Sequence, residues 1–270
     1  MPTLRENKEL WERNYDWAQQ GEEWSAPWGG SASQWRATLR PRINEFMPCH
    51  SVLEIAPGFG RWTQYLKELC DQLLVLDMSA RCIEGCRERF RGSSHIRYAV
   101  NDGLSLEAVE DRSIDFVFSF DSLVHAEAKV LENYLSQLER KLTRHGVGFI
   151  HHSNAARYRT YFSLAARLPR GRRFLTERGF LINDCARALD MSAELFEEYC
   201  GRAGLRCIGQ EIINWHGGAL IDCISLFTLP GSKWDRPNQV VENRSFVAEA
   251  AIAKRLSPLY AASTPGRNSP

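Results

Sequence analysis

The sequence predicts an α/β protein with a doubly wound, mostly parallel sheet of seven strands and helices on both faces. Strand-like and helix-like segments alternate from residue 51 to residue 229, an order typical of parallel sheets with crossover helices. The first strand-like segment ends in a glycine-bearing turn, P-G-F-G at 57–60. The chain has 270 residues, which is long enough for one large domain with added caps.

Five strands and three helices are expected before residue 154. The second helix has Ser79 as its N-cap, since a serine side chain accepts backbone N–H groups at that position. The third helix is amphipathic and is expected to close at Gly146. The expected strands are 51–56, 72–77, 95–100, 113–120 and 146–153, and the expected helices are 61–70, 79–90 and 125–146.

The last part of the sheet is expected to be a hairpin. A helix over 192–204 precedes two strands, 205–214 and 220–229, which are joined by the short loop W-H-G-G-A. A loop of this kind favours an antiparallel pair, here at the sheet edge.

Residues 154–190 interrupt the alternation and are too many for a simple loop. We expect a helical cap over the C-terminal edge of the sheet. Its arginines either bind a phosphate or carboxylate or form a solvated helix face, and the sequence leaves both open. They are Arg157, Arg159, Arg167, Arg170, Arg172 and Arg173.

The two ends of the chain are expected to be additions to the domain of residues 51–229. Residues 1–50 hold five of the tryptophans and form an aromatic cap or lid. Residues 230–270 form a C-terminal helix and a flexible tail. That helix, over 245–260, either docks on the core or builds a homodimer.

Composition excludes several classes of protein. The formal net charge is +1, so no basic field favours nucleic acid. No apolar run reaches the ~20 residues that span a bilayer. None of the eight cysteines forms a C-x-x-C pair, so we expect a reduced, cytoplasmic chain without a disulfide framework or zinc site.

The turn after the first strand is the expected ligand site, as in other doubly wound sheets. Gly58 and Gly60 allow a sharp turn and a close backbone approach to a ligand. A dinucleotide site would have a third glycine where Thr63 stands. Glu54 would repel a pyrophosphate but suits a ligand with an ammonium group, such as S-adenosylmethionine.

The run E-I-A-P-G-F-G at 54–60 resembles motif I of the class I S-adenosylmethionine-dependent methyltransferases, with Ala56 in place of the first glycine. The resemblance implies that Asp77 binds the ribose hydroxyls, that residues 101–103 contact the adenine and that residues 120 and 121 lie beside the methyl donor. The expected donor-binding residues include those of the turn and one tryptophan of the N-terminal segment; they are Trp28, Glu54, Ala56, Gly58, Gly60, Asp77, Met78, Asn101, Asp102, Gly103 and Phe120.

Histidines at two strand ends indicate a hydroxyl acceptor, because an alcohol needs a general base or a metal to be methylated. His125 and His152 are the candidate bases, with Asp121 orienting one of them. Alternatively, Asp121, His151 and His152, helped by Asn154, hold a divalent cation such as Mg²⁺. His216, in the hairpin loop, is a third histidine that lies near this edge if the hairpin bends inward.

The tryptophans of the N-terminal segment have two interpretations. Trp24, Trp28 and Trp35 present flat apolar faces that suit sugar rings, adenine and sulfonium cations, and Gly29 and Gly30 provide a hinge. The alternative is a tryptophan-rich core helix.

The runs W-G-G…Q-W, E-I-A-P-G-F-G-R-W-T, S-F-D-S-L-V-H and F-I-H-H-S-N resemble those of bacterial methyltransferases associated with polysaccharides. This resemblance implies an O-methyltransferase acting on a carbohydrate hydroxyl. The alternatives are a small-molecule methyltransferase acting on a phenol, amine or carboxylate, a nicotinamide-dependent oxidoreductase, and a methyltransferase-like scaffold without activity.

Overall fold

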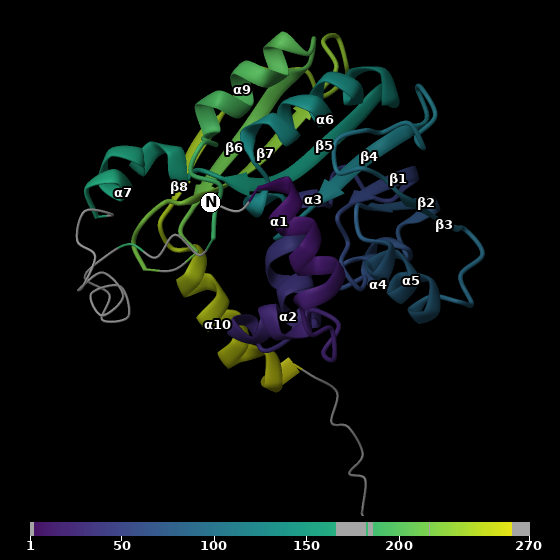
Figure 1. The fold of residues 1–270 in the computed structure, drawn as a ribbon, viewed down its shortest axis with the longest axis horizontal. Helices are drawn as coiled ribbons and strands as arrows, with labels where there is room; N and C mark the ends of the chain where they lie inside the picture. The colour runs from purple at the N-terminus through teal and green to yellow at the C-terminus, as the bar shows by residue number, and fades with distance from the viewer. Residues whose placement is uncertain (1–2, 166–181, 183–185, 216, 261–270) are drawn as a thin grey trace, which may run out of the picture.

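The structure of the chain, a computed structural model, describes residues 3–165, 182, 186–215 and 217–260. Its centre is a sheet of eight strands in the order β3-β2-β1-β4-β5-β7-β6-β8 (Figure 1). The strands are β1 (Cys49–Ile55), β2 (Cys70–Asp77), β3 (Ile96–Val100), β4 (Ile114–Ser119), β5 (Leu142–Ser153), β6 (Arg206–Ile213), β7 (Asp222–Thr228) and β8 (Val240–Asn243). The predicted doubly wound, mostly parallel sheet is confirmed, with one strand more than expected.

Strand order differs from the prediction at one side of the sheet. Strands β6 and β7 pair antiparallel as expected, but β7 lies between β6 and β5 and pairs with both. The edge strand is β8, which pairs parallel with β6. The prediction of an edge hairpin was therefore wrong, because β8 lies where the sequence predicted only a helix and a tail.

The long helix α6 (Ala128–Lys141) ends earlier than predicted. Residues 142–146 belong to β5 instead of the helix. Leu142 pairs with Ile114 of β4, and the hydroxyl of Thr143 donates to Asp115 at 2.8 Å. Pairing with β4 thus replaces the last predicted helical turn.

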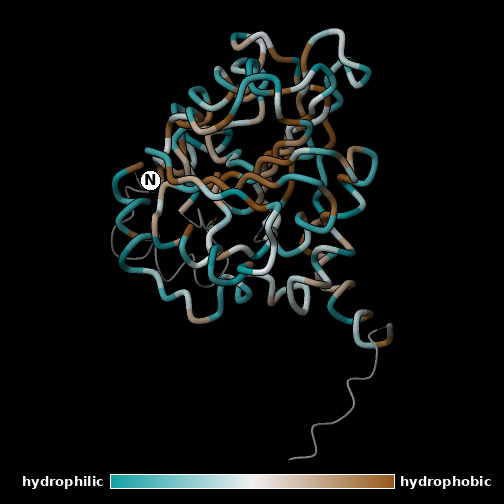
Figure 2. The backbone as a smooth tube through the Cα atoms, turned by 90° about the vertical axis from the view of Figure 1, so that its right-hand side faces the viewer, coloured by the Kyte–Doolittle hydropathy of each residue, from teal (hydrophilic) through white to brown (hydrophobic). Residues whose placement is uncertain are grey.

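Two helical layers cover the sheet, and the apolar strands run between them (Figure 2). Helices α6 and α9 (Ala193–Arg202) lie on one face. The other face is covered by η3 (Trp35–Leu39), α3 (Arg40–Ile43), α4 (Thr63–Leu66), α5 (Ala80–Arg89) and α10 (Phe246–Tyr260), and the short helix α2 (Ser31–Gln34) leads into η3. Ser79 caps α5, accepting the backbone N–H of Cys82 at 3.1 Å as predicted.

The N-terminal segment begins with three short helices, α1 (Leu4–Glu9), η1 (Leu10–Asn14) and η2 (Glu22–Trp28), which precede α2. Helix α1 is tied to the domain by the backbone N–H of Leu4, which donates to Glu127 at 2.9 Å. In Figure 1 this segment, in purple, runs from beside the sheet down to α2. Two shorter elements, η4 (Leu123–His125) and η5 (Ala155–Tyr158), follow β4 and β5, and α7 (Arg159–Ala165) follows η5.

Helix α10 docks on the core through Phe246, which is buried and packs against Trp28 and Trp215. None of the helices in the described ranges has the length and apolar character needed to cross a membrane. The seven cysteines that the structure describes carry free thiols.

Candidate active site

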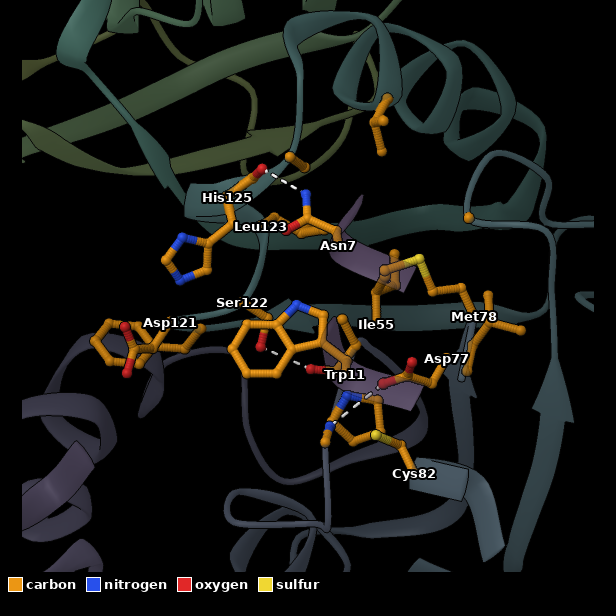
Figure 3. A pocket seen from close by; sticks show the side chains of 18 of the residues that line it. Asn7, Trp11, Ile55, Asp77, Met78, Cys82, Asp121, Ser122, Leu123 and His125 are labelled. Carbon is orange, nitrogen blue, oxygen red and sulfur yellow. Dashed lines mark hydrogen bonds between the residues drawn. The ribbon is translucent and has the colours of Figure 1, made fainter. Parts of the chain in front are cut away.

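A cavity opens at the C-terminal ends of β1, β2 and β4, where residues 55–58, 76–78, 120–123 and 125–127 form its floor. It contains about 870 Å³ of space, counting its open mouth. Figure 3 shows Asp77, Met78 and Cys82 at one end and His125 and Asp121 at the other. This is the edge at which doubly wound sheets bind their ligands.

The turn after β1 brings backbone to the first end of the cavity. Ala56 and Gly58 both line the cavity, and both have left-handed backbone angles, with φ of 57° and 58°. A left-handed alanine costs about 1–2 kcal/mol, which explains why the related motif has glycine there. Gly60 does not line the cavity; a Cβ at this position would lie 2.4 Å from the ring of Phe90, so its glycine serves the packing of the turn.

Asp77 is the acid at this end. Its carboxylate accepts the backbone N–H of Ser79 at 2.8 Å and that of Gly58 at 3.4 Å. Burial raises the pKa of Asp77 to about 6, although the two N–H groups oppose the rise. The carboxylate is therefore mostly ionised at neutral pH and still has lone pairs that can accept hydroxyl groups.

In the loop after β3, Gly103 lines the cavity, whereas Asn101 and Asp102, which were also expected to bind the donor, do not. Gly103 lines the cavity between Met78 and Leu4, and a Cβ added to it would lie 2.7 Å from Leu4. Asp102 is exposed and accepts the backbone N–H groups of residues 104 and 105, at 2.8 and 2.7 Å. The amide of Asn101 donates to the carbonyl of Ser105 at 2.9 Å and braces the same loop.

Glu54 lies behind the cavity wall. It is 1% exposed, and one of its oxygens accepts the hydroxyl of Thr63 at 2.6 Å while the other has no hydrogen-bond partner. Burial raises the pKa of Glu54 to about 8. Side chains alternate along a strand, and the neighbour Ile55 lines the cavity, so Glu54 points to the opposite face.

At the other end of the cavity, Arg61 and Asp121 form a buried ion pair. Nη2 of Arg61 donates to Asp121 at 2.8 Å, and Nη1 donates to Ser25 at 3.2 Å. The guanidinium also lies over the rings of Trp24 and Trp62, 5.2 and 4.6 Å from their centroids. The sequence reasoning did not single out Arg61; its only signal was a basic residue next to the glycine turn.

His125 lines the same end of the cavity. Its Nδ1 lies 3.0 Å from the carbonyl oxygen of Ala186. A carbonyl only accepts, so Nδ1 carries the proton and Nε2 of the neutral ring has the free lone pair. Burial and the nearby Arg187 lower the pKa of His125, which keeps the imidazole neutral at pH 7.

The two histidines that end β5 do not line the cavity. His152 stacks on Phe196, with ring centroids 4.4 Å apart, and both of its nitrogens are hydrogen-bonded, to Ser153 and to Ser225. Burial lowers the pKa of His152 to about 3. His151 points to the opposite face and stacks on Phe120, a lining residue, at 4.6 Å.

The residues predicted for a metal do not fit one. The carboxylate of Asp121 is paired with Arg61, and Nδ1 of His151 accepts the backbone N–H of Asp121 at 3.1 Å. The side chain of Asn154 bonds to backbone groups of Leu220 and Ala193. Across the described ranges, no group of three or more His, Cys, Asp or Glu side chains converges as a metal site would require.

The N-terminal segment roofs the cavity with Asn7, Trp11, Trp17 and Trp24. The amide of Asn7 donates to the carbonyl oxygen of His125 at 2.9 Å, and the ring of Trp11 lies 6.0 Å from that of His125 (Figure 3). Of these four residues, the sequence analysis had singled out only Trp24.

Trp28 and Trp35 lie in the core instead. The indole N–H of Trp28 donates to Thr38 at 2.9 Å, and Trp35 stacks on Tyr65 at 5.0 Å. The expectation of Trp28 at the donor therefore places it in the wrong layer. His216 and the arginines Arg167, Arg170, Arg172 and Arg173 lie outside the described residues.

Comparison with known proteins agrees with this architecture. Residues 52–146 match the family model of a methyltransferase domain. A comparison with curated proteins gives no match.

Many solved structures share the fold, among them the following three. The N-methyltransferase NodS from Bradyrhizobium japonicum, in complex with S-adenosylhomocysteine, is 16% identical, with a TM-score of 0.55 over 85% of this chain and 100% of that one. A SAM-dependent methyltransferase from Leishmania major is 11% identical, with a TM-score of 0.54 over 83% and 82%. A protein from Pyrococcus horikoshii is 18% identical, with a TM-score of 0.51 over 73% and 90%.

The chain therefore contains a methyltransferase domain, matched over residues 52–146. Its fold is shared with S-adenosylmethionine-dependent methyltransferases.

Proposed function

We propose that the chain is an O-methyltransferase that methylates a carbohydrate hydroxyl, with His125 as the general base. The observation that carries the proposal is the hydrogen bond between Nδ1 of His125 and the carbonyl of Ala186. It leaves the basic nitrogen of a cavity-lining histidine available to a hydroxyl group.

The donor is proposed to lie along the floor of the cavity. Asp77 accepts hydrogen bonds from the ribose hydroxyls, and Gly58, which has no side chain, lets the backbone come close to the donor. The adenine is enclosed by Met78, Gly103 and Leu4. Asp77 places a carboxylate in the cavity, which favours a donor whose net charge is positive. Phe120 then lies beside the reacting methyl group.

The reaction is a direct displacement, which requires a nucleophile aligned about 3–3.5 Å from the methyl carbon. His125 accepts the hydroxyl proton at Nε2 while the acceptor oxygen bonds to the methyl carbon and the carbon–sulfur bond breaks. The products are the methyl ether, S-adenosylhomocysteine and a protonated His125, which returns the proton to solvent. A positioned base contributes about 10²–10⁴-fold to such a step.

The walls at the acceptor end favour an uncharged, polyhydroxylated molecule. Arg61 and Asp121 neutralise each other there but retain donor and acceptor capacity for hydroxyl groups. Trp11, Trp24 and Trp62 supply aromatic surface against which the C–H face of a sugar ring can pack. The resemblance to polysaccharide-associated methyltransferases supports the same acceptor class.

An amine acceptor is the second candidate, and the likeness to the N-methyltransferase NodS favours it. A neutral amine attacks a sulfonium methyl without a base, so it makes a different prediction for His125. A scaffold without catalysis is the third, and it predicts donor binding without methyl transfer.

The test is mass spectrometry of a panel of mono- and oligosaccharides, phenols and amines after incubation with the protein and donor, with and without a chelator. We expect a mass gain of one methyl group on a saccharide, unaffected by the chelator and lost in His125→Ala. Methylation of amines alone, retained in His125→Ala, would overturn the proposal.

A further inference from the structure

Asp121 has a strained backbone at the acceptor end of the cavity. Its φ is 64°, in the left-handed region that non-glycine residues seldom adopt. Such a conformation persists when the surrounding structure determines it, and it is often part of a functional site. The carboxylate of Asp121 meanwhile holds Arg61 in the cavity wall. The groups that fix this backbone therefore fix the ion pair as well.

The group that contacts the strained backbone directly is His151. The backbone N–H of Asp121 donates to Nδ1 of His151 at 3.1 Å. Nδ1 is thus the unprotonated nitrogen, and in the neutral ring the proton is on Nε2. The ring is fully buried and lies between Phe120 and Trp215, with centroids 4.6 and 5.2 Å away.

Asp222 faces the other side of the ring. Nε2 of His151 lies 3.4 Å from Oδ2 of Asp222, which is a close electrostatic contact and not an aligned hydrogen bond. Asp222 is in turn held by Arg187, whose Nε and Nη2 donate at 2.9 and 2.8 Å. Although burial opposes it, this pairing keeps the pKa of Asp222 well below its usual range. A buried carboxylate at this place favours the proton on Nε2.

We infer that His151 is a positioning residue for methyl transfer. Asp222 holds its ring in the tautomer that accepts the Asp121 N–H, and this hydrogen bond fixes the position of the Arg61–Asp121 pair at the acceptor end of the cavity. His151 touches no substrate in this arrangement. It acts through the backbone of Asp121, and its tautomer is opposite to that of His125, in which Nδ1 donates. The inference rests on the proposed function only in calling this end of the cavity the acceptor end.

Two variants separate the hydrogen bond from the packing. His151→Phe keeps a flat ring against Phe120 and removes the acceptor. His151→Asn removes the ring but keeps an oxygen near the position of Nδ1. The measurement is hydrogen exchange of the Asp121 amide by NMR, without donor or acceptor, so it is independent of the proposed reaction.

We expect His151→Phe to speed exchange at Asp121 at least tenfold, and His151→Asn to remain within threefold of the wild type. Each should bind S-adenosylhomocysteine with a dissociation constant within threefold of the wild type, because the donor end is unchanged. Unchanged exchange in His151→Phe, or equal acceleration in both variants, would overturn the inference.

The tautomer supplies a second test that needs no folded variant at this site. In protein labelled with ¹⁵N-histidine, the wild-type spectrum should show a neutral ring protonated at Nε2 for His151. A ring protonated at Nδ1 would overturn the inference even if His151→Phe failed to fold.

Discussion

Arg61 and Asp121 form an ion pair of 2.8 Å within the cavity wall, although their side chains are only 4% and 8% exposed. The two residues are 60 positions apart and come from the turn after β1 and the segment after β4. Two charges that leave water together are stabilised mainly by each other, so the loss of one partner leaves an uncompensated charge.

Asp121→Asn tests this pairing without disturbing the backbone, since asparagine tolerates the left-handed region. We expect the free energy of unfolding to fall by about 3–5 kcal/mol in urea titrations. The double variant Arg61→Met/Asp121→Asn should recover most of the loss, because it leaves no unpaired charge. A double variant as unstable as the sum of the single losses would contradict the assigned pairing.

His125→Ala should lower the rate of methyl transfer to a saccharide by about 10²–10⁴-fold and leave the affinity for S-adenosylhomocysteine within threefold. The reason is that the proposed base acts on the acceptor and not on the donor. His50→Ala is the matched control, since His50 is exposed and pairs with Asp71 on β1 and β2. Equal rate losses in both variants would exclude a specific role for His125.

Variants of two tryptophans distinguish a residue that lines the cavity roof from one that lies in the core. Trp11→Ala should weaken the binding of the saccharide acceptor at least fivefold, because Trp11 lines the acceptor end of the cavity beside His125, with little change in melting temperature. Trp28→Phe should lower the unfolding free energy by about 1–3 kcal/mol, because it loses buried area and the bond to Thr38, with little change in affinity. Calorimetric titration with the saccharide and thermal denaturation of both variants give the comparison; a weakened affinity with unchanged stability in Trp28→Phe would place Trp28 at the cavity instead of in the core.

Glu54 makes the stability of the protein depend on pH. Its pKa is about 8 in the folded chain and 4.5 when unperturbed, so the folded state binds the proton more tightly. The resulting stabilisation is complete below about pH 4.5 and is lost as the pH rises to about 8.

Glu54→Gln should remove this component. Between pH 5 and 8, the wild type should lose about 2–4 kcal/mol of stability relative to Glu54→Gln, as measured by urea titrations at several pH values. Parallel curves for the two proteins would show that Glu54 is ionised in the folded state.

The sequence was most informative about residues that belong to a local pattern. The ends of strands β1, β2 and β4 were visible as apolar runs, and the acid or glycine that follows each run lies at the cavity: Gly58, Asp77 and Asp121. The shared C-terminal edge of parallel strands brings such residues together without any long-range information. Glu54, which was expected at the donor, does not line the cavity, because side chains alternate along β1 and it is the neighbouring Ile55 that faces the cavity.

The remaining site residues depend on packing that no local pattern encodes. Arg61 reaches the cavity through its pairing with Asp121 and its contacts with Trp24 and Trp62. Trp11 lines the cavity because the N-terminal segment folds back over it. The hydrogen bond from the Asn7 amide to the carbonyl oxygen of His125 holds the segment there. His151 and His152 point to opposite faces of the sheet, as the alternation of side chains along a strand requires, but the side chains that surround each of them are distant in sequence.

The central claim is that Asp77 and the turn at Gly58 bind the methyl donor in this cavity. Its most direct test is calorimetric titration of the purified, folded chain and of Asp77→Asn with S-adenosylhomocysteine. We predict binding of one molecule per chain to the wild type and an affinity at least tenfold weaker in Asp77→Asn. No binding to the folded wild type, or equal affinity in the two proteins, would contradict the claim.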